Sequence, residues 1–281
     1  MGIFFKNVNY SYKVVKTSYS ALSDINLQIE QKGEFIAICG HTGSGKSTLV
    51  QHINGLIFPT SGSVTVDNIK LPLKRGKKIL PLRKKVGLAF QFPEYQLFAE
   101  TVYKDIIFGP KNFKMTEEEI KQNVKYIASK LGIKDILERF PLELSGGQMR
   151  KVALAGVLAS NPDYIVLDEP TRGLDPRARE EIMNFFSELN DKFNKTIIMI
   201  THDMDVVSQY AKRVIVLKEG KIVFDDIKEN LFVHPDFNNF NLDIPSSIKI
   251  LKYLASKDLI NYKPLYKFEE IVSFLSGDKN E

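Results

Sequence analysis

The sequence predicts an α/β protein built around a sheet of buried, parallel-type strands. Three short apolar runs carry this prediction, since each has the length and composition of a strand that is covered on both faces. They are Phe35–Cys39, Tyr164–Leu167 and Thr196–Ile200. A chain of 281 residues can bury a large core of this kind together with one smaller appended region.

The first run leads into a glycine-rich loop, GHTGSGKST, and then into a helix expected from Lys46 onward. The glycines let successive N–H groups turn inward, and the helix N-terminus adds unpaired donors. In the pattern G-x-x-x-x-G-K-[ST], Lys46 can reach the terminal phosphates and Ser47 can bind Mg²⁺, which an ordinary Gly-rich turn does not require. The loop therefore predicts a nucleotide site formed by Gly40, His41, Thr42, Gly43, Ser44, Gly45, Lys46, Ser47 and Thr48.

Polar side chains follow three strand-like runs, two of them already described and one that ends before Gln91. Ligands of open α/β sheets bind beyond the carboxyl ends of strands. Asp168 would hold Mg²⁺, while the adjacent Glu169 would orient and polarise a water for attack on the terminal phosphorus. Gln91 could contact Mg²⁺ or a water, and an ordinary strand-terminating glutamine is an equal alternative. His202 could hydrogen-bond the terminal phosphate, whereas histidines at strand ends are usually surface or capping residues.

The segment from about residue 103 to 160 is predicted to be a helical subdomain inserted within the sheet domain. Thr116 and Glu119 have the spacing of a capping box at the start of one helix. The stretch LSGGQMRKVALAGVLA places Ser145, Gly146 and Gly147 immediately before another helix. The chain thus carries a second anion-binding helix N-terminus. A further helix is expected from Pro176 to Phe193, and a hairpin around Glu219-Gly220.

The net charge of +5 raises the question of an anionic partner, and seven basic residues lie within Lys74–Lys85. We interpret this run as a solvated hairpin in preference to a surface for lipid or nucleic acid. No aromatic residue interleaves with the charges to stack on bases, so no nucleic-acid partner is expected.

Several classes of protein are disfavoured by what the sequence lacks. No apolar run approaches the roughly 18 residues of a membrane span, and the first residues show no secretory signal. Cys39 is the only cysteine, which excludes an internal disulfide and a Cys-rich metal site. Its place in a strand predicts an inert packing residue.

The order of these motifs resembles the nucleotide-binding subunit of an ATP-binding cassette protein. The likeness covers residues 1–230 and includes GHTGSGKST, Gln91, LSGGQ, IVLDEP, GLD and His202. It implies a P-loop NTPase fold of the ATP-binding cassette type, with an N-terminal antiparallel β subdomain. It also implies head-to-tail pairing, in which the P-loop of one subunit faces the LSGGQ of the other across ATP. The residues involved in trans would be Ser145, Gly146, Gly147 and Gln148.

The same resemblance assigns two further positions. Tyr12 would stack on adenine, with Tyr10 as the alternative, and Asp175 would lie at the dimer seam. ATP and Mg²⁺ are the cofactors implied.

Within that family, FQFPEYQLFAETV and the following FGP are similar to the energy-coupling factor ATPases, which power bacterial vitamin and metal importers. Such importers commonly pair two nonidentical ATPases. Thr42 and GGQMRKVALAGVLA resemble the second of the pair, whereas Arg172 departs from the Ala or Ser that is more usual. The resemblance implies a homologous ATPase partner, a transmembrane coupling subunit and, indirectly, a substrate-binding membrane subunit. It places the chain at the cytoplasmic side of the cell membrane.

Residues 231–281 are predicted to form a small helical extension. Phe268, Ile271, Val272 and Leu275 follow helical spacing and give one apolar stripe. The stripe could fold back onto the sheet domain or contact a partner in a dimer.

Other functions remain as rivals. A DNA-repair ATPase would need a long coiled coil between P-loop and signature, but the residues between them show no sustained heptads, so this class is nearly excluded. A translation-factor ATPase would normally carry two cassettes, whereas this sequence shows one. A soluble nucleotide-dependent regulator and a cobalt or nickel importer ATPase are the remaining alternatives.

Overall fold

The chain is described by a computed structural model that covers residues 1–14, 17–30, 33–73 and 78–276. A six-stranded sheet forms its centre, with the order β10-β9-β3-β8-β7-β6. Neighbouring strands run parallel except at the β10–β9 edge, which is the expected hairpin. Their bounds are β3 (Phe35–Cys39), β6 (Val86–Ala89), β7 (Tyr164–Asp168), β8 (Thr196–Ile200), β9 (Arg213–Lys218) and β10 (Lys221–Ile227). The predicted α/β class is confirmed, and the three apolar runs are β3, β7 and β8.

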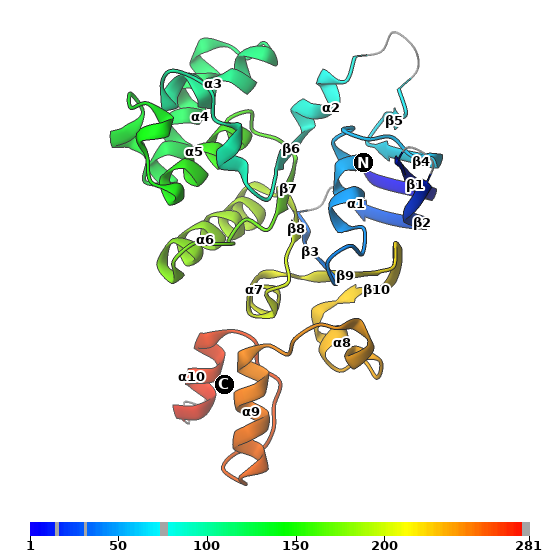
Figure 1. Ribbon diagram of the computed structural model, residues 1–281. Coiled ribbons are helices and arrows are strands. Elements are labelled where there is room, and N and C mark those ends of the chain that lie inside the picture. Colours follow the sequence, from blue (N-terminus) through cyan, green and yellow to red (C-terminus); the bar gives the residue numbers. More distant parts are fainter. Residues whose placement is uncertain (15–16, 31–32, 74–77, 277–281) are drawn as a thin grey trace.

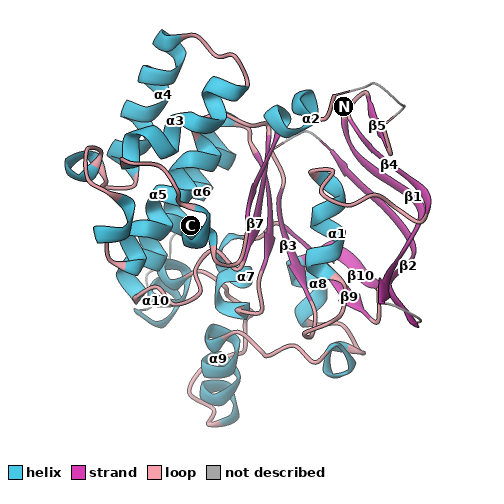
Figure 2. Ribbon diagram, turned by 45° about the horizontal axis from the view of Figure 1, so that its top comes forward, coloured by secondary structure: helices cyan, strands magenta, loops and turns pink. Residues whose placement is uncertain are grey.

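A second, four-stranded antiparallel sheet has the order β2-β1-β4-β5. Its strands are β1 (Gly2–Val14), β2 (Thr17–Glu30), β4 (Ser61–Val66) and β5 (Ile69–Leu71). The helix α1 (Lys46–Ile53) lies between the two sheets (Figures 1 and 2). Its buried side chains share one core with Ile36 and Ile38 of β3 and with strands of the second sheet. The antiparallel N-terminal sheet that the family resemblance implied is therefore present.

The opposite face of the central sheet is covered by longer helices. Phe35, Ile165 and Ile197 point to this face, whereas their neighbours Ile36, Val166 and Ile198 point toward α1. This alternation explains why these strands are apolar at every position. Of the longer helices, α5 (Gly146–Leu158) and α6 (Pro176–Phe193) contact the strands, while α3 (Val102–Asn112) and α4 (Glu117–Lys130) pack against α5. The short turns in this layer are η1 (Pro93–Gln96), η2 (Lys134–Ile136) and η3 (Pro141–Glu143).

Several local predictions, two in this helical layer and one in β3, are confirmed. The Thr116–Glu119 capping box opens α4, and α6 has the expected bounds. Cys39 is a buried free thiol, and burial raises its pKa to about 12, so it packs as an inert residue. The division of the chain into a cassette domain and an extension near residue 230 stays a prediction.

The basic segment differs from its prediction. Residues 74–77 lie outside the described part of the chain, and Leu80–Lys85 forms a helix, α2, where a hairpin was expected. Pro81 stands in the first turn, and Leu82 is buried. The basic side chains of α2 lie in its last turn, where positive charge stabilises a helix. One of them, Lys85, pairs with the buried carboxylate of Asp67. Arg83, Lys84 and Lys85 of this run thus belong to a packed helix.

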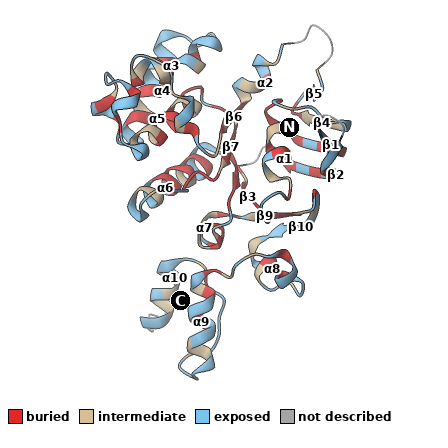
Figure 3. Cartoon of the chain, viewed as in Figure 1, coloured by how far each residue is buried: buried red, intermediate tan, exposed pale blue. Residues whose placement is uncertain are grey.

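The remaining elements follow α7 (Met204–Tyr210) and β10, and are α8 (Lys228–Phe232), η4 (Phe237–Phe240), α9 (Ser246–Ser256) and α10 (Phe268–Ser276). None of the residues of α10, all of which the structure describes, is buried (Figure 3). Phe268 is 71% exposed and Val272 is 47% exposed. The stripe is thus not part of the buried core, although Ile271 is half-buried. Its packing on the sheet domain and its contact with a partner in a dimer both stay predictions. Across the described ranges, no helix has both the length and the apolar character that crossing a membrane demands.

Candidate nucleotide site

The glycine-rich loop connects β3 to α1 at the carboxyl end of the central sheet. Gly40, Gly43 and Gly45 have φ values of +138°, +82° and +103°, which side chains rarely adopt. A Cβ at Gly40 would lie 2.2 Å from the carbonyl oxygen of Leu217, and one at Gly45 would lie 2.5 Å from that of Ala21. The sequence thus needs glycine here for backbone shape and for close packing.

The ammonium of Lys46 folds back over this loop. Its Nζ donates to the carbonyl oxygens of Gly40 and His41 at 2.7 and 2.8 Å. Burial lowers the pKa of this ammonium, although the charges of Glu169 and Asp168 oppose the shift. The lysine is therefore a half-buried cation that bonds two main-chain oxygens and, at 3.5 Å, the Ser44 hydroxyl, with the charges of Asp168 and Glu169 nearby. Such a cation can bind a phosphate.

Ser47 and Asp168 meet at the edge of this loop. The Ser47 hydroxyl donates to Asp168 Oδ2 at 2.9 Å. Burial raises the pKa of the Asp168 carboxyl, and the neighbouring Glu169 charge raises it further. The described residues contain no group of three His, Cys, Asp or Glu side chains that could hold a metal by themselves. Mg²⁺ usually takes one or two carboxylates plus substrate phosphates and water, so Ser47 and Asp168 fit an ion shared with a nucleotide.

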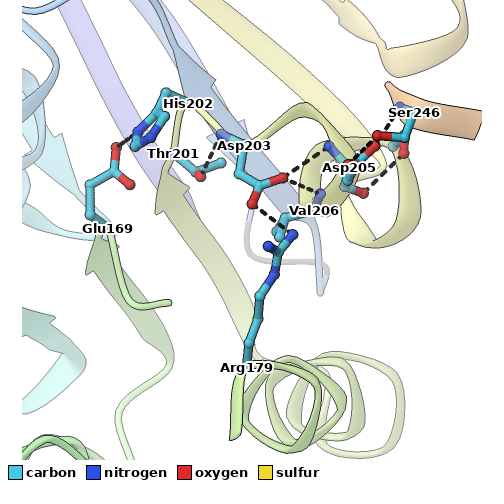
Figure 4. A network of polar contacts seen from close by, with 9 residues as sticks. Glu169, Arg179, Thr201, His202, Asp203, Asp205, Val206 and Ser246 are labelled. Atoms are coloured by element: carbon cyan, nitrogen blue, oxygen red, sulfur yellow. Dashed lines mark hydrogen bonds and ion pairs between the residues drawn. The ribbon is translucent and has the colours of Figure 1, made fainter. Parts of the chain in front are cut away.

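Glu169 follows directly and is buried in a strained conformation. Its φ of +51° lies in the left-handed region, which is uncommon for a residue with a side chain and often marks a functional site. The carboxylate is 2.8 Å from Nδ1 of His202, whose side chain is 71% exposed (Figure 4). His202 thus contacts the proposed catalytic base. Its hydrogen bond to the terminal phosphate stays a prediction.

The comparisons with known proteins agree with this geometry. The family model described as "ABC transporter" matches residues 22–172. The chain is 44% identical to the energy-coupling factor transporter ATP-binding protein EcfA2 of Ligilactobacillus salivarius, with 100% of each chain covered. It is 48% identical to the EcfA2 of Enterococcus faecalis, over 92% of this chain and 90% of the relative. The chain belongs to the energy-coupling factor transporter ATP-binding proteins.

Solved structures of ATP-binding cassettes resemble this family member in fold. CbiO1 from Clostridium perfringens, described as part of the ABC transporter complex cbiONQ, superposes with a TM-score of 0.73 at 35% identity, covering 91% of this chain and 94% of that one. A dimeric cassette in a post-hydrolysis state with ADP and Pi also gives 0.73, at 33% identity over 80% and 98% of the two chains. The predicted cassette fold is thereby confirmed.

The signature loop of this energy-coupling factor ATP-binding protein opens α5. Ser145 Oγ accepts from the backbone N–H of Gln148 at 3.3 Å, and Gln148 Oε1 accepts from the N–H of Ser145 at 3.0 Å. This capping box is a structural role that sequence reasoning missed, although the S-x-x-Q spacing signals it. Gly146 and Gly147 are exposed. Asp175 similarly caps α6 by accepting from Ala178 N–H at 2.9 Å, and its place at a dimer seam stays a prediction.

The two aromatic candidates for adenine differ in exposure. Tyr12 is 41% exposed, and its hydroxyl lies 3.1 Å from Thr48 Oγ1 on the P-loop helix. Tyr10 is half-buried and packs edge-on against His52, with 5.1 Å between ring centroids. Tyr12 therefore offers the freer ring beside the loop, which favours it as the stacking residue.

Gln91 lies just beyond β6, the parallel neighbour of β7, so it shares an edge of the sheet with Asp168. It is half-buried, and its main-chain oxygen accepts from Arg150 at 3.3 Å. Its proposed contact with Mg²⁺ or water stays a prediction.

A polar network continues from His202 toward the C-terminal extension (Figure 4). Asp203 caps α7 by accepting from the N–H groups of Asp205 and Val206, and it pairs with Arg179 of α6 at 2.6 Å. Asp205 accepts from the N–H and hydroxyl of Ser246 at 2.6 and 2.8 Å. Sequence reasoning missed these contacts, and the capping signal of an Asp before a helix could have found only the first. They fix the His202 loop against α6, α7 and α9.

Proposed function

We propose that this chain is the ATP-hydrolysing subunit of an energy-coupling factor importer, and that it acts with a second, homologous ATPase to drive uptake of vitamins or other micronutrients. One observation carries the proposal. The phosphate-type loop, the Ser47–Asp168 pair and the buried Glu169 converge at one edge of the central sheet. This is the combination that phosphoryl transfer to water requires.

Each residue has a physical role in this proposal. The loop from Gly40 to Thr48 holds the phosphates, and Lys46 exchanges its main-chain partners for phosphate oxygens. Ser47 and Asp168 would hold Mg²⁺, with Gln91 nearby; when bound, the ion neutralises phosphate charge. Glu169 orients the attacking water and accepts its proton, while His202 keeps that carboxylate in place.

The second ATPase would supply the signature loop that contacts the ATP bound to this chain's P-loop. The helices that begin at the P-loop and at LSGGQ pack on opposite faces of the central sheet. We therefore expect the two loops of one subunit to contact two different ATP molecules. In the proposed pair, Ser145, Gly146, Gly147 and Gln148 contact ATP held by the other subunit. ATP between both loops favours the closed pair, and loss of the γ-phosphate favours opening.

Membrane partners convert this motion into transport. A helix of a transmembrane coupling subunit would dock near Gln91 and the helices α3–α5, which places the chain on the cytoplasmic face of the membrane as a peripheral subunit. A second candidate within the same family, left open by the sequence, is the ATPase of a cobalt or nickel importer.

Purification of the tagged chain from membranes in mild detergent, followed by mass spectrometry, tests the assembly. We expect a second, different ATPase and a polytopic membrane protein. Recovery of the chain alone or only with itself, outside the membrane fraction, would contradict the transport role and favour a soluble regulator.

Glu169→Gln tests the chemistry in the same complex. ATP binding and partner recovery should persist, while hydrolysis falls about 100-fold or more and uptake stops. The exposed Glu229→Gln is the matched control and should leave all of these unchanged. Unchanged uptake in Glu169→Gln would count against coupling.

A further inference from the structure

Arg150 is a buried charge that the proposed chemistry does not use. It lies in the first half of α5, just after the signature loop, and only 5% of it is exposed. A guanidinium is always charged, so burying it is costly unless every part of it has a partner. Its partners therefore show what this position holds together.

The guanidinium of Arg150 contacts three points that are distant in sequence. It pairs with Glu94 of η1, with 3.2 Å between Nη2 and Oε1, and it donates to the main-chain oxygen of Gln91 at 3.3 Å. Its Nη1 donates to the main-chain oxygen of Arg172. Both Glu94 and Arg150 are largely buried, with side-chain exposures of 15% and 6%. One planar group thus joins α5, the Gln91 loop and the segment after β7.

A second contact ties two of these segments together. The guanidinium of Arg172 lies over the ring of Phe92, 5.7 Å from its centroid. Arg172 is also the residue that departs from the usual pattern of the family. The Gln91 loop and the Arg172 segment are therefore joined through Arg150 and through the Phe92 ring.

The segments that meet here are those that flank the proposed site. Gln91 is a predicted ligand, and Arg172 stands three residues after Glu169 and three before Asp175. The helix α5 begins at the signature loop. If α5 moved without the other two segments, a guanidinium and a carboxylate would remain buried without partners, which disfavours separate motion.

We propose that Arg150 is a positioning residue that fixes the Gln91 loop and the Glu169–Asp175 segment to the signature helix, so that the three move as one unit. Its five donors in a rigid fork match a carboxylate and two carbonyls at once, which the single ammonium of a lysine does not. Its effect on hydrolysis rests on the proposed function; its effect on the two segments does not.

The test compares Arg150→Gln, Arg150→Lys and Glu94→Gln with Lys151→Gln in the full-length protein with its partners. Lys151 is the adjacent residue and also pairs with a carboxylate, Glu181 at 3.1 Å, but on α6. Steady-state hydrolysis gives kcat and KM, and hydrogen exchange of residues 91–96 and 170–175 in nucleotide-free protein reports the positioning directly. Thermal unfolding identifies variants that are misfolded.

For Arg150→Gln we expect kcat to fall about tenfold or more with KM changed less than about threefold, because the site is misplaced while nucleotide contacts remain. Exchange should accelerate in both segments. In Glu94→Gln the fall in kcat should be smaller, because Arg150 keeps its two carbonyl acceptors. In Arg150→Lys slow hydrogen exchange should persist only in residues 91–96, which contain Glu94. Lys151→Gln should stay within about twofold of the parent in kcat.

A folded Arg150→Gln protein with parental kcat and parental exchange would overturn the proposal, as would an equal loss in Lys151→Gln. If Arg150→Gln does not fold, Glu94→Gln and Phe92→Leu address the same contacts and must accelerate exchange in residues 91–96. If the parent protein binds no ATP, the proposed function fails, and exchange still decides the role of Arg150.

Discussion

Two glycine loops open helices in this molecule, and they differ in what requires the glycine. In the P-loop, Gly40, Gly43 and Gly45 all have positive φ, and two of them are also packed against main-chain oxygens. In the signature loop, Gly146 and Gly147 have no positive φ, and a Cβ at either would meet no described atom within 4 Å. Nothing in this chain's backbone or packing explains glycine at these two positions.

The difference indicates which loop has its binding groups within this chain and which loop lacks them. Glycine at a helix start costs stability relative to alanine unless something must approach closely. The P-loop has its lysine, hydroxyl and carboxylates within the chain, whereas the signature loop presents exposed N–H groups without a cation or a metal-binding pair on its own helix start. The open space beside Gly146 and Gly147 would admit a ligand held by a partner, as the proposed head-to-tail pair requires.

Alanine at matched positions gives the sharpest test of this comparison. Gly45→Ala should lower the free energy of unfolding by about 3 kcal/mol, because of strained φ and a Cβ 2.5 Å from the oxygen of Ala21. Gly147→Ala should leave stability unchanged or raise it by about 0.5 kcal/mol, yet lower hydrolysis by the assembled pair about tenfold or more. Urea unfolding and steady-state hydrolysis measure the two effects.

The comparison fails if Gly147→Ala destabilises the protein as much as Gly45→Ala does. It also fails if the assembled pair with Gly147→Ala hydrolyses ATP at the parental rate. Nucleotide binding by the separate subunit provides the control, since Gly147→Ala should not change it.

Asp168 extends the comparison to electrostatics, because its half-buried carboxylate lies beside the P-loop and bonds Ser47. Burial raises its pKa in the folded protein, so the folded state binds more protons than the unfolded state between the two pKa values. Stability is therefore lost as the pH rises through that window. Asp168→Asn should be more stable than the parent at neutral pH without nucleotide, and this advantage should vanish in acid below about pH 3.9. Mg²⁺-dependent hydrolysis should fall about 100-fold.

Unfolding midpoints measured across a pH series, without nucleotide or Mg²⁺, check the expectation for Asp168→Asn. Glu229→Gln, which removes one exposed charge, is the control. A stability difference that does not change with pH would show that desolvation of Asp168 is not its cause.

Much of this site was predictable because its chemistry is local in sequence. The P-loop spacing specifies Lys46 and Ser47, and a buried strand that ends in two acids specifies Asp168 and Glu169. The parallel sheet then brings both to one edge, as its topology requires. Their roles in catalysis stay predictions until variants are measured.

What was not predictable depends on long-range contacts. Neither the Arg150 contacts with Glu94 and Arg172 nor the Asp205–Ser246 pair leaves a spacing signal, since their partners are 56, 22 and 41 residues away. The basic segment was misjudged for a similar reason: burial of Leu82 and the distant partner Asp67 turn charged sequence into a packed helix.

Substitutions of Tyr12 have the smallest expected effects. Two variants distinguish the contribution of its ring from that of its hydroxyl. Tyr12→Phe removes only the 3.1 Å contact with Thr48, so we expect a stability loss of about 0.5–1 kcal/mol and a KM for ATP within about twofold of the parent. Tyr12→Ala removes the exposed ring and should raise KM about tenfold, because base stacking on an aromatic ring is lost. Equal KM values in both variants would transfer the stacking role to Tyr10, whose ring is held against His52. In that case the adenine would stack on a half-buried ring that already packs against the protein core.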